Sequence, residues 1–248
     1  MARKKTPLTA TSRSPMDDDP VVRGLLRAIS LKRIKPGTKL VADQLVEAFG
    51  SNRTHIRQVF EYLGSRNIIQ LYPNRGAYLA QPSVDEARQI FATRRVLERQ
   101  AVLQLIDNLN ANSIDALKRH VGREHSHGEH DRWSTLTITG EFHGLIANLC
   151  GNSVLARFID ELVLRSSLII ATFEQHGGED DCSPEAHPDI AQRILARDRK
   201  GAAAAMETHL QAMEDRLSLD AEPEPQLDLV SIFADLGVKP GRRRKAAG

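Results

Sequence analysis

The chain has 248 residues, 41% of them hydrophobic and 27% charged, with a formal net charge of +2. This length and composition predict one large or two modest domains with a real core, and no apolar run is long enough to span a bilayer. The basic start at Met1–Lys5 precedes no apolar signal segment, and Cys150 and Cys182 do not make a disulfide framework. We therefore expect a cytoplasmic protein without a membrane partner, whose two cysteines are buried and unpaired.

The small net charge hides an uneven distribution along the chain. Residues 21–82 hold 10 Lys and Arg against 3 Asp and Glu, a balance of +7. Residues 83–219 hold 15 against 21, a balance of −6. This asymmetry indicates that only the N-terminal part meets a polyanion.

The first elements follow a polar leader. Residues 1–16 lack periodicity and are expected to form a disordered arm. Asp17–Asp19 followed by Pro20 predicts the start of a helix, because acidic residues favour a helix N-terminus and Pro favours its first position. Pro36-Gly37 predicts a turn after that helix.

The stretch from 40 to 80 predicts a helix, a tight turn, a second helix and a short β-hairpin. Gly50-Ser51 forms the predicted turn, and Asn52 is suited to cap the second helix. That helix repeats apolar residues at i, i+3, i+4 and i+7, at Ile56, Val59, Phe60 and Leu63. Residues 68–72 and 77–80 then predict two strands around a turn at 73–76. A helix-turn-helix with a two-stranded wing is a known arrangement for reading duplex DNA.

The predicted DNA contacts lie on the polar face of the second helix and on the wing. Arg53 and Arg57 are candidates for contacts with guanine or phosphate. Gly76 at the wing tip allows close approach to the duplex. The complete predicted set is Lys39, Arg53, Thr54, Arg57, Gln58, Arg75 and Gly76.

Three motifs in this region resemble the signature of GntR-family transcription regulators. They are residues 36–40 (Pro-Gly-Thr-Lys-Leu), 52–57 (Asn-Arg-Thr-His-Ile-Arg) and 74–76 (Asn-Arg-Gly). The family usually has Ser and Val where this chain has Asn52 and Ile56, and both replacements keep the local role. The resemblance implies a winged helix-turn-helix over residues 17–81.

Residues 83–219 read as helix after helix. We predict helices at 84–108, 113–124, 133–150, 153–176, 185–199 and 202–219, punctuated by glycines, Gly201 among them. Short connections between long helices predict an antiparallel bundle. The fold class is therefore mainly α, with an N-terminal winged helix-turn-helix and a C-terminal all-α domain.

A hydrophilic run interrupts these helices. His120, His125, His127 and His130 occur there among acidic residues that include Glu124. We expect a solvated connection rather than a metal clip, because the spacing fits no tetrahedral motif. Residues 220–248 are expected to form a linker and a basic tail, with one or two amphipathic turns at 227–236.

Charged and histidine side chains occur where the bundle should be apolar. Arg94 falls within the apolar stripe of helix 84–108, so it either pairs with Glu98 one turn away or faces a polar cavity. His143, His187 and His209 lie on or beside the apolar stripes of three other helices. Each alone is typical of a core histidine, but together they could converge on one metal.

The same region resembles the FCD domain of the FadR-like GntR branch. The resemblance is carried by residues 94–98, Phe142-His143, Gly151-Asn152, His187 with Ile190, and the spacing from Asp198 to Leu210. It implies an effector-binding and dimerisation domain, with a divalent metal, often zinc, held by one Asp and three His. The family histidines fall on His143, His187 and His209, and the carboxylate-binding Arg falls on Arg94.

One position departs from the family pattern. Thr139 stands where the family has its metal-binding Asp, and a neutral hydroxyl is a poor zinc ligand. Three histidines with an open position can still hold zinc, completed by water or by an effector carboxylate. Alternatively the histidines line an anion pocket without metal. The predicted effector-binding residues are Arg94, Glu98 and Thr139.

The sequence thus predicts a homodimeric, ligand-responsive regulator, acting as a repressor on a palindromic operator and sensing a small carboxylate. Within the same branch, the alternative is a metal-free sensor of acyl-CoA or fatty acid. A metal-dependent hydrolase with a three-histidine site is the alternative from another class. We expect no enzyme, because Glu98 is better used by Arg94 and no other general base is evident.

Overall fold

The computed structural model describes residues 14–126, 132–174, 186–218, 233–234 and 236–238. The predicted arm up to residue 13, His127, His130, Cys182 and the basic tail lie outside these described residues. The chain divides into two compact units. Of the described residues, 14–87, 164–174, 217–218, 233–234 and 236–238 belong to the N-terminal unit, and 88–126, 132–163 and 186–216 belong to the helical unit.

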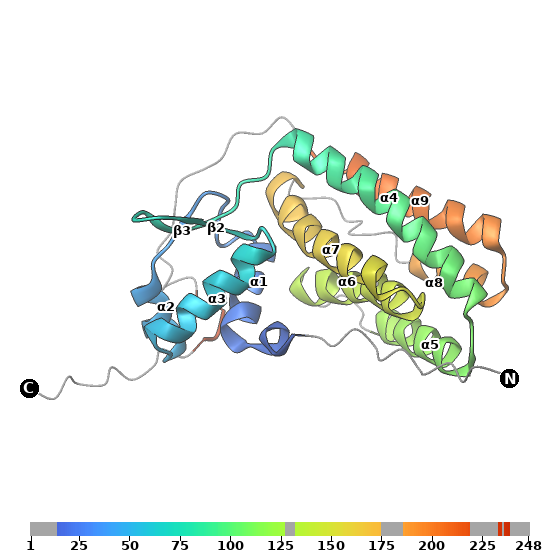
Figure 1. Ribbon diagram of the computed structural model, residues 1–248, viewed down its shortest axis with the longest axis horizontal. Helices are drawn as coiled ribbons and strands as arrows, with labels where there is room; N and C mark the ends of the chain where they lie inside the picture. The colour runs from blue at the N-terminus through green and yellow to red at the C-terminus, as the bar shows by residue number, and fades with distance from the viewer. Residues whose placement is uncertain (1–13, 127–131, 175–185, 219–232, 235, 239–248) are drawn as a thin grey trace, which may run out of the picture. The chain divides into compact units, whose positions relative to one another are not determined.

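Helices dominate both units (Figure 1). The elements are a 3-10 helix η1 (Pro15–Asp18), α1 (Pro20–Ser30), β1 (Lys39–Leu40), α2 (Ala42–Phe49), α3 (Arg53–Ser65), β2 (Ile69–Tyr72), β3 (Gly76–Leu79), α4 (Val84–Asp107), α5 (Ala111–Ser126), α6 (Arg132–Leu149), α7 (Ser153–Phe173), α8 (Ala186–Leu195) and α9 (Arg199–Asp215). None of these described helices combines the length and apolar character needed to cross a lipid bilayer.

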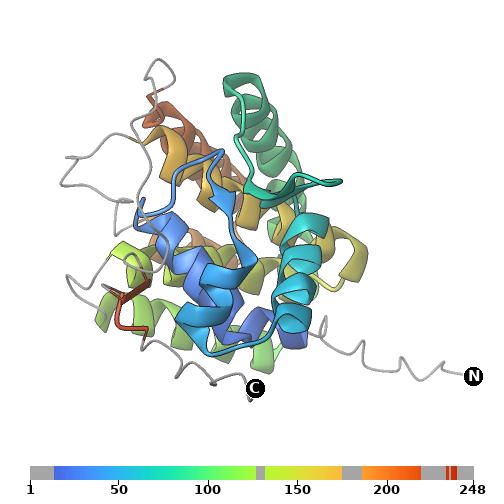
Figure 2. The ribbon, with the colours of Figure 1, turned by 90° about the vertical axis from the view of Figure 1, so that its left-hand side faces the viewer.

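The N-terminal unit is a helix-turn-helix with a wing, and Figure 2 shows its helices α1, α2 and α3 grouped with the small sheet. Leu25 of α1, Leu45 of α2 and Ile56 of α3 are fully buried in one apolar core. The apolar face predicted for residues 52–66 is therefore confirmed, since Val59 and Leu63 are buried as well.

The wing contains one more strand than the sequence predicts. The sheet order is β1-β3-β2, and both pairs are antiparallel. Lys39 of β1 pairs with Tyr78, and Tyr72 pairs with Gly76 at the end of the hairpin. Strand β1 is only two residues long, so it has too little alternation to be recognised from its sequence.

Both predicted helix starts are confirmed. Asn52 caps α3, where its side chain accepts a hydrogen bond of 2.9 Å from the backbone nitrogen of His55. Asp19 caps α1 and accepts from the backbone nitrogens of Val21 and Val22. Gly50 ends α2 with φ of 62°, a left-handed conformation that favours glycine.

The core of the N-terminal unit also contains a residue from near the end of the chain. Phe233 is fully buried and packs edge to face on Phe49 of α2, with ring centroids 4.8 Å apart. Leu236 and Val238 pack partly buried against the same core. The sequence predicts one or two amphipathic turns at 227–236 between a linker and a tail, but it does not predict this contact with the N-terminal core, because a single aromatic residue leaves no periodic pattern.

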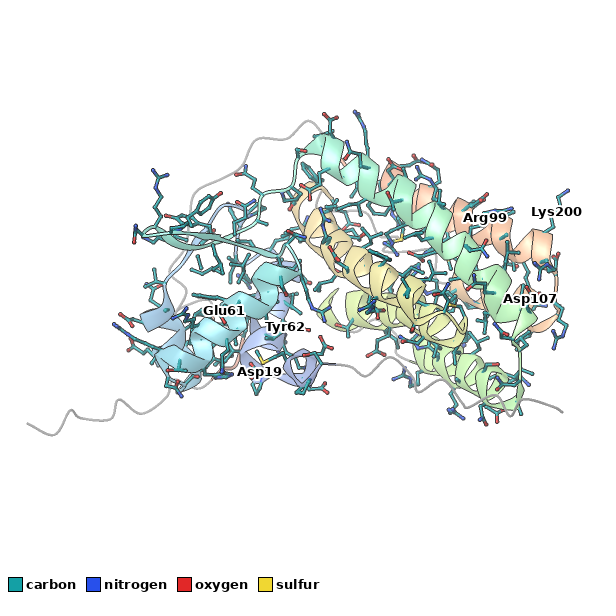
Figure 3. All side chains as sticks on the ribbon, viewed as in Figure 1. Asp19, Glu61, Tyr62, Arg99, Asp107 and Lys200 are labelled. Carbon is teal, nitrogen blue, oxygen red and sulfur yellow. The ribbon has the colours of Figure 1, made fainter. Side chains whose placement is uncertain are left out.

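Helices α4 to α9 form where helices are predicted between residues 83 and 219, with shifted ends, although the part of α7 from Leu164 onwards belongs to the N-terminal unit. Helix α9 begins at Arg199 rather than at 202, because Asp198 caps it by accepting 2.9 Å from the backbone nitrogen of Gly201. Gly201 therefore lies in the first turn of α9 and does not separate two helices. Helices α4 and α9 lie side by side, linked by Arg95 with Glu214 and by Arg99 with Glu207 (Figures 1 and 3). Cys150 is buried and free, as predicted.

Candidate nucleic-acid interface and metal centre

Helix α3 presents a polar face from an anchored apolar side. Ile56, Val59 and Leu63 are fully buried, which fixes the rotation of the helix about its axis. The opposite face is exposed and carries the predicted residues Arg53, Thr54, Arg57 and Gln58. These four side chains are thus available to a duplex on the outer face of α3.

Both arginines of this face already contact a carboxylate. The guanidinium of Arg53 donates to both oxygens of Asp43 on α2 at 2.7 Å, and this hydrogen bond raises the pKa of Arg53. Arg57 donates from Nε to Glu61 at 2.9 Å, with side chains 79% and 54% exposed. Because exposed ion pairs contribute little to stability, the arginines can exchange these carboxylates for DNA.

The wing brings together three of the predicted DNA contacts. Arg75 is exposed in the turn between β2 and β3, after Asn74 with φ of 61°. Gly76 follows with φ of 98°, and a Cβ there would lie 3.6 Å from Cε of Lys39. The Lys39 ammonium lies 5.9 Å from the ring centre of Tyr78. Two cations and a glycine therefore share the wing tip.

The N-terminal unit also contains a series of hydrogen-bonded side chains that was not predicted. Oγ of Ser51 lies 2.6 Å from Nδ1 of His55, and Nε2 of His55 lies 2.7 Å from Oδ2 of Asp19. Ser51 is in the turn before α3, whereas Asp19 caps α1. The only available sequence signal was the polar pair Ser51 and His55 at i, i+4, since Asp19 lies 36 residues from His55.

Three histidines from three helices converge in the helical unit. His143 of α6, His187 of α8 and His209 of α9 are only 2%, 3% and 6% exposed. Nε2 of His209 lies 3.1 Å from Nε2 of His187 and 3.3 Å from Nε2 of His143. Tetrahedral zinc with bonds of about 2.0–2.1 Å holds its nitrogen ligands about 3.3 Å apart. Two of the separations therefore match this geometry, and one ligand atom from each histidine lies within 4.8 Å of the others, so the three could hold one ion.

Two of these imidazoles bind a carboxylate through Nδ1, the ring nitrogen that does not face the other histidines. Nδ1 of His143 donates to Glu98 at 2.5 Å, and Nδ1 of His187 donates to Glu124 at 2.6 Å. An imidazole that donates from Nδ1 keeps the lone pair on Nε2, which is the tautomer a metal needs. The donor set therefore fits a divalent cation.

The protonation states agree with this donor set. Burial lowers the pKa of His143 to about 4, although Glu98 opposes the shift. Burial, followed by the nearby charges of His143 and His187, lowers the pKa of His209 well below its ordinary range. Burial alone would raise the pKa of Glu98, but Arg94 and His143 lower it to about 2. Since His143 is neutral at pH 7, Arg94 is the charge that keeps Glu98 ionised.

Arg94 is the largest fully buried side chain of the helical unit. Its Nε donates to Glu98 at 2.6 Å, so the first of the two predicted alternatives is found. Among the residues that the structure describes, none is a hydrogen-bond partner of its buried Nη2. Glu98 therefore links Arg94 to His143. The Nη2 atom of Arg94 can still donate a hydrogen bond to an anion. Thr139 lies one helical turn before His143 and is 5% exposed.

The expectation of a solvated histidine run was wrong for its described part. His120 is only 3% exposed, and it and Glu124 lie one turn apart on α5. Glu124 contacts His187 on α8, and Nδ1 of His120 lies 3.1 Å from Arg123. The segment is polar on average, and for this reason its sequence did not indicate that one face of α5 points into the helical unit. His125 is exposed, as predicted.

Residues 89–212 match the family model of the FCD domain. Among curated proteins, the chain is 22% identical over 190 residues to the uncharacterised HTH-type transcriptional regulator BphR of Paraburkholderia xenovorans strain LB400, covering 73% of this chain and 76% of BphR. It is 21% identical over 196 residues to the HTH-type transcriptional repressor RspR of Escherichia coli K12, covering 79% and 86%. It is 24% identical over 208 residues to the HTH-type transcriptional regulator LutR of Bacillus subtilis 168, covering 75% and 94%.

Solved structures show the same fold. E. coli McbR/YncC superposes with a TM-score of 0.68 at 19% identity, covering 81% of this chain and 95% of that chain. A transcriptional regulator GntR from Rhodococcus sp. RHA1 superposes with a TM-score of 0.63 at 18% identity, covering 78% and 94%.

Proposed function

Because this chain belongs to the FCD-domain branch of the GntR family of transcription regulators, we propose that it is a sequence-specific repressor controlled by a small carboxylate. It binds a palindromic operator as a homodimer in the cytoplasm, since a twofold dimer reads two half-sites of the same sequence. The relative RspR is a transcriptional repressor, which supports repression rather than activation of transcription.

DNA reading is assigned to α3 and the wing. Arg53, Thr54, Arg57 and Gln58 enter the major groove, while Lys39, Arg75 and Gly76 approach the backbone or minor groove. The supporting observation is the exposed polar face of a helix whose other face is completely buried.

Replacement of Arg57 tests this assignment. A lost bidentate base contact costs about 1–3 kcal/mol, so Arg57→Ala should weaken operator binding by about 5–150-fold. Arg119→Ala is the matched control, because Arg119 is exposed on α5 and removes the same charge. Binding to operator and random duplexes would be compared at one salt concentration. Undiminished specific binding by Arg57→Ala would reject the assignment.

Effector sensing is assigned to the centre of the helical unit, and the convergence of three Nε2 atoms carries this proposal. His143, His187 and His209 would hold a divalent metal, with zinc as the best fit to three imidazoles. When bound, the cation supplies a Lewis-acidic position for an oxygen ligand. Arg94 and Thr139 are the proposed effector contacts, and Glu98, which bonds to both Arg94 and His143, would orient these two side chains.

Elemental analysis tests the metal assignment. His187→Ala should lose most of the bound metal, whereas His125→Ala should retain it, because His125 is an exposed histidine on α5. Equal metal content in the two variants would exclude His187 as a ligand.

The partnerless Nη2 atom of Arg94 supports an anionic effector. A thermal-shift screen of small organic acids and acyl-CoA, each with and without zinc, would identify it, since a ligand at 100 times its Kd stabilises the fold by about 2.7 kcal/mol. A response that needs zinc supports the metal-centred site. Thr139 in place of the family Asp favours the metal-free alternative, and an acyl-CoA response without zinc would establish that alternative.

The hydrolase alternative is not supported. BphR, RspR and LutR are transcriptional regulators, as is the Rhodococcus structure, so the chain is a regulator rather than an enzyme.

Effector control requires that the effector binds two states of the protein with different affinities, because equal affinity shifts no equilibrium.

The homodimer proposal is supported by an apolar surface on the helical unit. A groove of about 980 Å³ lies between α4 and α9, and Val96 in its lining is 67% exposed. We assign this surface to the interface with the second protomer of the homodimer. Val96→Glu should lower the mass measured by light scattering, and an unchanged mass would move the interface elsewhere.

A further inference from the structure

The helix-turn-helix contains a hydrogen-bonded chain that no assignment above uses. Ser51, His55 and Asp19 are joined in that order, with 2.6 Å between Ser51 and His55 and 2.7 Å between His55 and Asp19. Asp19 lies at the start of α1 (Figure 3), His55 in the first turn of α3, and Ser51 in the turn before it. The chain therefore ends at the edge of the exposed α3 face.

Asp19 determines which nitrogen of His55 carries a proton. Its Oδ1 accepts from the backbone nitrogens of Val21 and Val22, and its Oδ2 faces Nε2 of His55. A carboxylate is an acceptor only, so Nε2 must be the donor. The side chains of His55 and Asp19 are only 29% and 13% exposed, which limits competition from water.

The charge of His55 then determines what Ser51 can offer. A neutral His55 has only a lone pair at Nδ1, so Ser51 must donate its hydroxyl proton inward. A protonated His55 donates from Nδ1, so Ser51 accepts inward and its proton is free to point outward. Phosphate oxygens accept hydrogen bonds and do not donate them. Ser51 can therefore donate to a DNA phosphate only when His55 is charged.

We propose that Ser51 is a phosphate contact and that His55 and Asp19 are positioning residues, so that operator binding takes up one proton per protomer. This inference rests on the DNA-binding function proposed above. Histidine is the side chain suited to such a change between pH 5 and 8.

Two other carboxylates on the packed elements have partners of their own. Asp17 of η1 accepts from Tyr62 and lies 3.7 Å from Arg66, the residue that follows α3. Asp43 of α2 binds Arg53. Asp19 is thus the carboxylate placed on His55 among these described groups.

Operator binding should be measured from pH 6 to 8 at constant ionic strength. The affinity of the wild type for its operator should fall as the pH rises, by up to about tenfold per pH unit for each protomer, because of proton linkage. Ser51→Ala should weaken binding by about tenfold at pH 6 and show a flat pH profile, because the donor is gone. His55→Asn should also be flat, since an amide can donate to Ser51 at every pH. His125→Ala should keep the wild-type slope.

Calorimetry in two buffers of different ionisation enthalpy counts the protons directly. Uptake near one proton per protomer in the wild type, and near zero in Ser51→Ala, is the expected result. Absence of uptake in the wild type, or an unchanged slope in Ser51→Ala, would overturn the proposal and leave the chain as a structural clamp between α1 and α3. Specific, pH-independent operator binding would reject this inference alone, whereas no specific binding at any pH would reject the DNA-binding function itself.

Discussion

Two ion pairs with the same spacing show how differently the two units use the same residues. Arg57 and Glu61 are four residues apart on α3, bond at 2.9 Å, and have side chains 79% and 54% exposed. Glu61 is labelled on α3 in Figure 3. Arg94 and Glu98 are four residues apart on α4, bond at 2.6 Å, and have side chains 2% and 1% exposed. The exposed pair can exchange its partner, whereas the buried pair is fixed and shared with His143. Burial thus separates a binding residue from a positioning one.

The strongest test of this contrast is removal of the carboxylate from each pair. Glu98→Ala should destabilise the helical unit by about 3–5 kcal/mol, because it leaves a buried guanidinium uncompensated. Glu61→Ala should change stability by no more than about 0.5 kcal/mol. Urea unfolding at pH 7, followed by the circular dichroism of the helices in both units, would measure both. Similar losses in the two variants would show that the buried pair has no special role.

Acid should weaken the buried pair and spare the exposed one. The pKa of Glu98 is lowered to about 2 in the fold from an ordinary 4.5, so its stabilising contribution is present above pH 4.5 and disappears as pH falls towards 2. The pKa of His143 is lowered from 6.5 to about 4, so stability also falls with pH between these values. Unfolding of metal-free protein should therefore become easier from pH 6.5 downwards, and Glu98→Gln should flatten the part below 4.5. Equal acid sensitivity of wild type and Glu98→Gln would contradict this.

The position that departs from the family pattern allows the metal site to be strengthened. Thr139→Asp adds a carboxylate one turn before His143 and should tighten zinc binding by about tenfold or more, since even outer partners change metal affinity by about 10–100-fold. Without metal the same variant should be less stable, because the new charge is buried. Thr137→Asp, on the same helix, is the control and should not tighten binding. Competition with a chromophoric chelator measures the affinity.

The smallest expected effect concerns the exposed pair. Glu61→Ala frees Arg57 and should raise operator affinity by about twofold, in line with the small energies of exposed ion pairs. Asp107→Ala removes a similarly exposed partner from Arg199, outside the groove assigned to the dimer, and should leave operator affinity unchanged. If Glu61→Ala weakened binding, Glu61 would be orienting Arg57 rather than competing for it.

Local features of the fold were predictable, and long-range contacts were not. The cap at Asn52, the apolar face of α3 and the hairpin follow from residues a few positions apart, and the structure confirms them. The placement of Glu124 behind His187 spans 63 residues and leaves no periodic signal. Periodicity placed the three histidines near inner faces, but only coordinates could bring their Nε2 atoms within reach of one another.

The aromatic contact between Phe49 and Phe233 has a practical consequence for anyone who shortens or tags this protein. A fragment ending after the wing would leave the Phe49 side chain without its covering ring, and a fusion near residue 233 would crowd it. Experiments on the isolated N-terminal part should therefore carry the late segment along. Otherwise a loss of DNA affinity would reflect a damaged core rather than a missing contact.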